Sequence, residues 1–427
     1  MKNGWTGGQY SVFRIFFGAY LCLYFLELLS LAREMDSAAG ALAGRAASPF
    51  LGLFPNVLAL WDSPLAVRLL LVAAVTCAVL FAAGKWDRWA ALGALYALVC
   101  LRVWGPEILP HLWLPYVGSL LLAHAFLPRA PYGSMEARAR TDPAGGWRMT
   151  ESIFLLAWVL MAVGYSYSGY TKLISASWTD GTALLRVLEN PLARPGIPRD
   201  ILLAMPEVLL RLATWGTLAL ELLFAPLALI RRARPWLWTV MLVMHFNLMT
   251  VINFIDLSMG MVILHFFTLD PAWIRPVALA FRPASSSARN DIPSTEWLFY
   301  DGSCGLCHRA VRFVLAEDRT GEAFRFAPLD GDRFNELIPE ADRAALPDSL
   351  VVRTADGRLL TRSTGVLHIM ARLGGLWRVM SIVVRVIPAT LRDAAYDFIA
   401  AIRYRLFARP KDACPLLPPH LRQRFDL

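Results

Sequence analysis

Two cysteines separated by two residues, Cys304 and Cys307, have the spacing that most clearly indicates chemistry in this chain. They follow a short apolar and aromatic stretch, residues 296–300, and precede residues 306–316, in which apolar residues recur at helical spacing. A cysteine at a helix N-terminus lies among unpaired N–H groups at the positive end of the helix dipole, which stabilises its thiolate. We therefore expect Cys304 to attack a disulfide and Cys307 to resolve the mixed disulfide. Asp301 could assist proton transfer, or could simply cap the turn.

Three other interpretations of the cysteine pair compete with dithiol redox chemistry. Half of a zinc site is one, but no second Cys or His pair in the sequence has ligand spacing. With His308, the motif also matches the Cys-x-x-Cys-His pattern of c-type haem attachment. The strand before the motif, the helix after it and the cytoplasmic side predicted below argue against haem. The third interpretation is a pair of buried structural thiols, and the sequence favours redox chemistry over all three.

A second candidate for chemistry is Lys172, which ends an apolar run rich in small and aromatic residues and is followed by Trp178. A lysine held among apolar and aromatic groups can serve as a base near neutral pH. The competing interpretation is a lysine that only anchors a membrane span by reaching toward the interface, and the pattern alone favours it.

Polar residues inside the apolar runs are further candidates, because burying them in a bilayer is costly. Glu221 lies in the middle of such a run, with Arg211 as the only cation near it in sequence. His245 and His265 lie in two later runs. For each single residue, a hydrogen bond between helices is the favoured interpretation. No spacing of His, Asp and Glu predicts a metal site.

The elements that must position these residues fall into two regions. The chain has 427 residues, of which 57% are hydrophobic and 18% charged, which excludes disorder, a fibrous repeat and an ordinary cytosolic enzyme. We predict an α-helical membrane domain of about eight spans over residues 1–280. The spans are expected near residues 12–31, 67–84, 89–104, 112–127, 152–168, 206–230, 235–252 and 257–269.

The net charge of +9 is spread over short basic groups, which need not indicate nucleic acid, so no nucleic-acid partner is expected. These groups fall in alternate loops, as the positive-inside rule requires if both termini are cytoplasmic. We therefore predict a bacterial inner-membrane protein whose loop 172–206 faces the opposite side. A cleaved signal peptide is disfavoured because the first apolar stretch is too long and contains Arg14 and Glu27.

The composition changes after the first 280 residues. Residues 281–295 resemble a flexible linker, and residues 296–427 have the charge content of a soluble domain. Asp356-Gly357 predicts a hairpin between residues 349–353 and 358–361, and residues 366–373 and 391–407 are predicted helices. The order strand, helix, hairpin, helix indicates an α/β domain compatible with a thioredoxin-like layer structure.

Residues 300–307, Tyr-Asp-Gly-Ser-Cys-Gly-Leu-Cys, resemble the opening of the DCC family of thiol–disulfide oxidoreductases. The tail of the chain is also similar to this family, through Tyr396, residues 402–407, Cys414-Pro415 and Arg424-Phe425. The resemblance implies a thioredoxin-like fold with Cys304 and Cys307 as the redox pair. Cys414 is expected to be structural.

Gly169-x-x-Lys172-Leu173, with Trp178 and Gly181, resembles the horizontally transferred transmembrane (HTTM) domain, which is related to vitamin K-dependent γ-glutamyl carboxylases. The resemblance covers about residues 5–275 and implies that Lys172 is the base that deprotonates reduced vitamin K. Trp178, His245 and Glu221 would then contact the cofactor. The carboxylases' Asn-His pair has no clear counterpart, with only His111 as a substitute, and their large extracytoplasmic domain is missing. Glutamate carboxylation is therefore doubtful, whereas a cavity for a quinol or a lipid is still expected.

The leading hypothesis is a membrane-bound thiol–disulfide oxidoreductase that exchanges electrons with a protein thiol or a quinone-like molecule. One alternative is a carboxylase-like, quinol-using membrane enzyme with Lys172 as the base. Another is a non-catalytic module that binds lipid or peptide and carries a redox-regulated tail. The expected partners are membrane lipid, a thiol or quinone substrate and a peptide or protein substrate, with a vitamin K-like quinone as the one cofactor considered.

Overall fold

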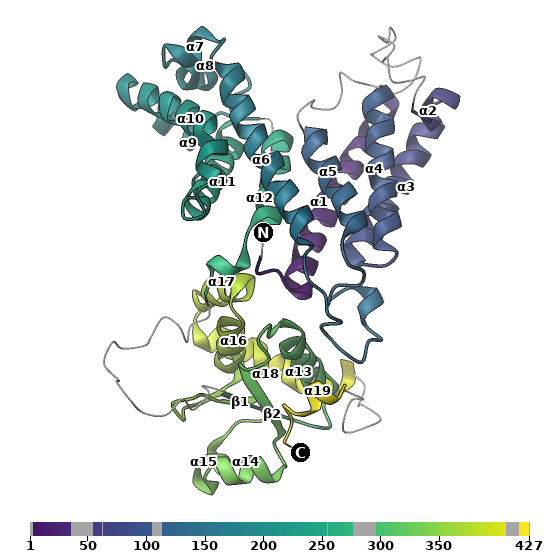
Figure 1. Ribbon diagram of the computed structural model, residues 1–427, viewed down its shortest axis with the longest axis vertical. Coiled ribbons are helices and arrows are strands. Elements are labelled where there is room, and N and C mark those ends of the chain that lie inside the picture. Colours follow the sequence, from purple (N-terminus) through teal and green to yellow (C-terminus); the bar gives the residue numbers. More distant parts are fainter. Residues whose placement is uncertain are drawn as a thin grey trace. The chain divides into compact units, whose positions relative to one another are not determined.

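The computed structural model describes residues 3–35, 54–61, 63–104, 113–253, 255–275, 296–406 and 418–426 (Figure 1). These residues form two compact units, and each is described by itself. Unit 1 consists of Phe13–Leu127 and Thr150–Leu269, and unit 2 of Lys2–Val12, Pro128–Met149 and Asp270–Leu427. The predicted linker at 281–295, His111 and Cys414 all lie outside the described residues.

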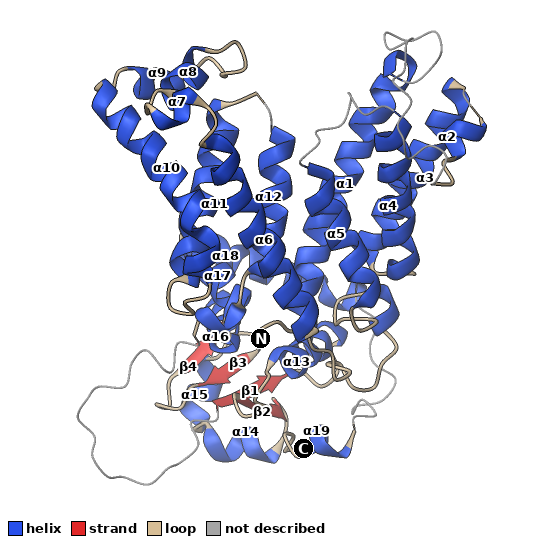
Figure 2. Cartoon of the chain, turned by 45° about the horizontal axis from the view of Figure 1, so that its top comes forward, coloured by secondary structure: helices blue, strands red, loops and turns tan. Residues whose placement is uncertain are grey.

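Unit 1 is built from helices, with no strand among its described residues (Figure 2). The first of these helices, α1, begins in unit 2 and continues in unit 1. The helices are α1 (Gly7–Met35), α2 (Val57–Leu60), α3 (Pro64–Ala83), α4 (Asp87–Trp104), α5 (Trp113–Phe126), α6 (Glu151–Lys172), α7 (Ala176–Thr179), α8 (Ala183–Glu189), α9 (Ile197–Leu203), α10 (Glu207–Ala228), α11 (Arg234–Val251) and α12 (Ile255–Thr268).

Each of the eight predicted spans coincides with a helix, namely α1, α3, α4, α5, α6, α10, α11 and α12. Within the described part of the chain, four helices are long and apolar enough to cross a membrane. These are α3, α6, α10 and the Gly7–Ala32 portion of α1, whereas α5 and α12 contain shorter apolar segments. The helical character of the predicted spans is therefore confirmed, and the number that cross a bilayer stays a prediction.

The ends of α3 show how local sequence fixes the bounds of a helix. The Ser63 side chain accepts a hydrogen bond from the Ala66 N–H, and Pro64 occupies the first turn, where a missing N–H costs nothing. Gly84 ends the helix with a φ of 68°, a conformation that glycine adopts without steric strain.

Unit 2 contains a four-stranded mixed sheet in the order β2-β1-β3-β4. β1 is parallel to β2 and antiparallel to β3, which is antiparallel to β4. The strands are β1 (Glu296–Tyr300), β2 (Phe324–Pro328), β3 (Val351–Arg353) and β4 (Leu359–Thr361). The helices are η1 (Met135–Ala137), η2 (Pro271–Trp273), α13 (Gly305–Glu317), α14 (Asp332–Leu337), α15 (Glu340–Ala345), α16 (Arg362–Leu373), α17 (Gly375–Arg385), α18 (Ala389–Leu406) and α19 (Pro419–Arg422).

The predicted order of strand, helix, hairpin and helix is confirmed by β1, α13, the β3–β4 hairpin and α16. β2 and the helices α14, α15, α17 and α19 were not predicted from the sequence. Leu298 of β1 pairs with Phe326 of β2 and Val352 of β3, and all three side chains are buried in one core cluster. This core fixes the end of β1, from which the chain turns into α13.

The far end of α13 is held by a buried carboxylate, Glu317. It accepts hydrogen bonds from the Gly8 N–H at 2.8 Å, from the Thr6 hydroxyl and from the Trp377 indole at 2.6 Å. Burial raises the pKa of Glu317 above its ordinary value even though all three donors favour the charged form. Glu317 therefore ties the N-terminal segment and α17 to the helix that begins at the cysteine pair.

Candidate functional site

Cys304 is the N-cap of α13. Its backbone is extended, with φ −97° and ψ 116°, and its Sγ accepts a hydrogen bond from the Cys307 N–H at 3.4 Å. The expected position of a thiol at the start of a helix is thus observed, where free N–H groups favour a thiolate.

The two thiols differ in environment. Both are free cysteines, Cys304 is fully buried, and Cys307 is half-buried. Burial raises the pKa of Cys307 to about 12, with the neighbouring Cys304 adding to the effect. Cys307 is therefore protonated at neutral pH, whereas Cys304 has the position that favours the nucleophilic thiolate. Because Cys304 is buried, a substrate reaches it only after a local opening.

Asp301 organises the turn between β1 and α13. Its Oδ1 accepts hydrogen bonds from the N–H and the hydroxyl of Ser303, each at 2.8 Å, and its Oδ2 accepts one from the Tyr404 hydroxyl. Burial acts to raise the pKa of Asp301, but the hydrogen bonds from Tyr404 and Ser303 outweigh it and leave this pKa below its ordinary value. Asp301 is therefore ionised at neutral pH, which suits a turn-capping acceptor and, in the resting state, not a proton donor.

Arg403 and Tyr404, at the end of α18, are the residues at this site whose role the sequence analysis missed. The Arg403 guanidinium is buried, lies 3.6 Å from Asp301 Oδ2 and donates to Asp348 at 2.8 Å. The Tyr404 hydroxyl accepts a hydrogen bond from Arg403 at 3.0 Å while it donates to Asp301. Both residues belong to the tail that resembles the DCC family, but nothing in their spacing indicates a contact with residues 301–304, the dithiol turn.

His308 has a structural role in the described geometry. Its Nε2 lies 2.8 Å from the Gly302 carbonyl oxygen, and its ring meets Tyr300 edge-on at 5.8 Å between centroids. The imidazole therefore closes the turn that presents the cysteines.

In unit 1, Lys172 and Glu221 form an ion pair between α6 and α10. Glu221 is buried, and the Lys172 ammonium also lies 4.4 Å from the centre of the Trp178 ring. Arg211, the cation that lies nearest to Glu221 in the sequence, instead pairs with Glu207 at 2.8 Å. The cation that Glu221 meets is thus distant in sequence, and three candidate residues, Lys172, Glu221 and Trp178, are brought together.

Small residues allow α6 and α10 to approach closely at this ion pair. A side chain on Gly169 would place its Cβ 2.6 Å from the Leu222 backbone nitrogen. Pro226 has no N–H, so the Leu222 carbonyl one turn earlier in α10 lacks its usual helical hydrogen bond. The Ser166 hydroxyl of α6 donates to that carbonyl at 3.1 Å instead. The Gly169-x-x-Lys172 spacing therefore has a physical reason, because Gly169 allows the contact that brings Lys172 to Glu221.

His245 contributes to a second buried group of polar side chains. Its Nε2 lies 2.8 Å from the Tyr165 hydroxyl, which lies 3.4 Å from His265 Nε2. The Nδ1 of His265 lies 2.8 Å from the Met261 carbonyl oxygen of the same helix. Three helices, α6, α11 and α12, are thus joined by one hydrogen-bonded chain. Its two histidines were candidates from the sequence, whereas Tyr165 was not given a role of its own.

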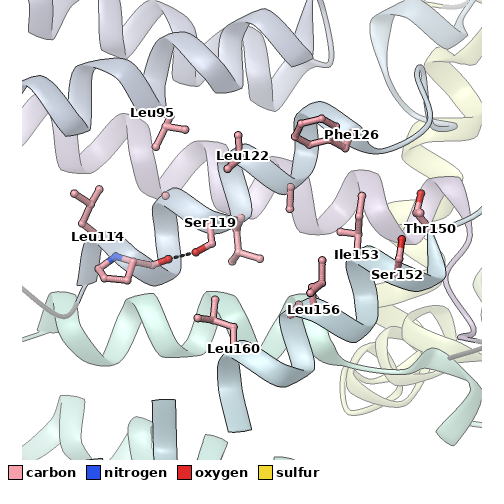
Figure 3. A pocket seen from close by; sticks show the side chains of 15 residues that line it. Leu95, Leu114, Ser119, Leu122, Phe126, Thr150, Ser152, Ile153, Leu156 and Leu160 are labelled. Carbon is pink, nitrogen blue, oxygen red and sulfur yellow. Dashed lines mark hydrogen bonds between the residues drawn. The ribbon is translucent and has the colours of Figure 1, made fainter. Parts of the chain in front are cut away.

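A cavity of about 800 Å³ lies along α4, α5 and α6 (Figure 3). Its walls are mostly apolar, with Leu95, Leu114, Leu122, Ile153 and Leu160 among them, and Figure 3 shows the Ser119 hydroxyl turned to the Pro115 carbonyl of its own helix. The predicted cofactor residues do not line this cavity. Among the described residues, no group of three or more His, Cys, Asp or Glu could hold a metal ion.

Residues 298–409 match the family described as DCC1-like thiol-disulfide oxidoreductase. The uncharacterized protein YuxK of Bacillus subtilis (strain 168) is 31% identical over 128 residues, which are 30% of this chain and 91% of YuxK. A chloroplastic DCC family protein of Arabidopsis thaliana is 31% identical over 119 residues, 28% of this chain and 68% of the relative. No solved structure matches the chain. The chain belongs to the DCC1-like thiol–disulfide oxidoreductase family through its C-terminal region, and this membership indicates a redox function.

Proposed function

We propose that this protein is a membrane-bound thiol–disulfide oxidoreductase in which Cys304 is the nucleophile and Cys307 resolves the intermediate. The observation that carries the proposal is the position of Cys304 at the N-cap of α13, with its sulfur facing the Cys307 N–H, inside the region that matches the family. Disulfides are attacked by a thiolate, and a helix N-terminus stabilises one.

The exchange proceeds in two displacements. The Cys304 thiolate attacks one sulfur of a substrate disulfide, whose S–S bond breaks as a mixed disulfide forms, and the released substrate sulfur takes up a proton. Cys307 then loses its proton and attacks the Cys304 sulfur, which releases the second substrate thiol. The substrate gains two electrons and two protons, and the protein dithiol becomes a disulfide that an external dithiol reduces again.

Insulin reduction by the purified full-length protein, with a chemical dithiol as donor, tests this function. Cys304→Ser and Cys307→Ser should each abolish turnover, whereas the matched control Cys22→Ser, on α1, should retain it. Equal activity in Cys304→Ser and the unmodified protein would refute the proposal and favour a non-catalytic module with a redox-regulated tail.

The membrane location is part of the proposal and is supported by the four apolar helices. We propose that eight helices span a bacterial inner membrane and that both termini are cytoplasmic. We also propose that the mixed sheet has a thioredoxin-like arrangement. The alternating basic loops and the strand order β2-β1-β3-β4 support these assignments.

A second candidate function is the use of a quinone-like molecule by unit 1, which the HTTM resemblance suggests. The contact of Lys172 with Glu221 and Trp178 favours it, because a charged pair beside an indole ring can bind a polar aromatic head group. In the ion pair with Glu221, Lys172 is an ammonium without a free lone pair, so it must lose a proton before it can accept one from a quinol. Lys172→Ala should abolish turnover of a quinone substrate while exchange with a small disulfide continues. Full quinone turnover in Lys172→Ala would make Lys172 an anchor and refute the carboxylase-like role.

A further inference from the structure

The C-terminal region, residues 296–426, exposes large apolar side chains in one stretch of its described part. Among its described residues, every large hydrophobic side chain that is exposed lies between residues 379 and 404, on α17, on α18 or in the turn that joins them. The exposed fractions are high at the centre of this stretch, with 62% for Val383, 83% for Val386 and 65% for Phe398. Singly exposed apolar residues are ordinary on a protein surface, but a continuous group of them marks an interaction site.

The two helices expose the face that a soluble domain normally buries. On α17 and at its C-cap, Val379, Ile382, Val383 and Val386 recur at helical spacing and are exposed, while the buried positions carry Trp377 and Ser381. On α18, Leu391 and Phe398 are exposed at the corresponding spacing of seven residues. An amphipathic helix in a globular domain turns its apolar side inward, whereas α17 and α18 also expose rows of large apolar side chains.

The charges around this surface are positive. Arg378 and Arg385 lie on one flank of α17, and Arg392 lies at the start of α18. The nearby carboxylates have partners within the domain, because Asp393 accepts hydrogen bonds from Ser363 and Asp397 pairs with Arg362 at 3.1 Å. The apolar face is therefore flanked by arginines and not by uncompensated acids.

We propose that the exposed face of α17 and α18 lies on a lipid bilayer, with its apolar side chains among the acyl chains and its arginines at anionic head groups. An apolar helix face with cationic flanks binds an interface of this kind, and each basic residue near an anionic surface strengthens the attraction. The same chain supplies helices long and apolar enough to cross a membrane, so a bilayer is within reach of this domain. The surface does not include the dithiol turn, and contact with lipid does not require the reaction at Cys304.

The test uses the full chain in lipid nanodiscs containing phosphatidylglycerol, with a photoreactive p-benzoylphenylalanine in place of Val383. The matched control carries the same group in place of Glu336, a 61% exposed side chain on α14. Mass spectrometry after irradiation should find lipid adducts at position 383 and few or none at position 336. Adducts of position 383 to a second copy of the chain, or to the helices of unit 1, would overturn the proposal, as would equal lipid labelling at the two positions.

The attraction of the arginines to anionic head groups is tested in the same experiment with Arg385→Glu. This change removes one cation and adds one anion, so lipid labelling at position 383 should fall by about fivefold or more in anionic nanodiscs. Labelling should change little in discs of phosphatidylcholine alone. An equal effect in both kinds of disc would contradict a head-group contact at the arginines.

Discussion

The hydrogen bond from Tyr404 to Asp301 provides a quantitative prediction, because it joins α18 to the turn that presents the buried Cys304. Replacing Tyr404 by Phe removes the hydroxyl and keeps the ring. A hydrogen bond to a charged group stabilises by about 1.5–3 kcal/mol, which we reduce to about 1 kcal/mol because Tyr404 is exposed to solvent. If the turn must open before Cys304 reacts, and if it recloses quickly, the reaction rate follows the opening equilibrium. A loss of about 1 kcal/mol then accelerates the reaction about fivefold.

The assay measures by mass spectrometry how fast iodoacetamide alkylates Cys304. The protein carries Cys307→Ser, so Cys304 is the only thiol of the motif that can react. The control is Tyr167→Phe, which removes an exposed phenol hydroxyl from α6. Alkylation should be about fivefold faster in Tyr404→Phe and unchanged in the control. A rate for Tyr404→Phe that equals the parent rate would refute the view that α18 restricts access to Cys304.

Three further predictions concern stability and topology. Gly169→Ala should lower the thermal unfolding midpoint by forcing α6 from α10, at a cost of about 1–3 kcal/mol, whereas Gly216→Ala, with open space around it, should not lower it. Glu317 binds its proton more tightly in the folded state, so its contribution to stability is greatest at acidic pH and falls as pH rises through the raised pKa. Denaturant unfolding should therefore show the stability of the unmodified protein decreasing with pH relative to Glu317→Gln, and a constant difference would contradict this. A reporter fused after Leu427 should be active in the cytoplasm, and activity confined to the periplasm would contradict the proposed topology.

Features of the fold that depend on one continuous stretch of residues could be predicted from the sequence. The eight apolar segments all became helices, and Asp356-Gly357 marked the β3–β4 hairpin, because hydrophobic runs and turn residues act locally. The strand β2 was missed because five residues ending in Pro328 give too short an alternation to stand out. The short helices α7, α8 and α9 depend on packing against longer helices, and their own sequences are too short to indicate a helix.

Contacts between distant residues could not be predicted from spacing. Lys172 and Glu221 are 49 residues apart and Asp301 and Tyr404 are 103 apart, so only the folded chain shows that each pair meets. The sequence did identify Lys172, Glu221, Asp301 and the cysteine pair as candidates, because their residue types are costly or reactive where they lie. Their geometric relations came from the packing of α6 on α10 and of α18 on the dithiol turn.

The most direct test of the central claim is to trap the mixed disulfide. The full-length Cys307→Ser protein, treated with a small aromatic disulfide and analysed by peptide mass spectrometry without reduction, should carry one disulfide-linked adduct at Cys304. The Cys304→Ser protein, which keeps Cys307, should form such an adduct far more slowly, because the raised pKa of Cys307 leaves almost no thiolate at neutral pH. An adduct at Cys304 in the first variant and little at Cys307 in the second would support the proposed order of attack. Failure of Cys304 to form any adduct, or faster reaction at Cys307, would contradict it.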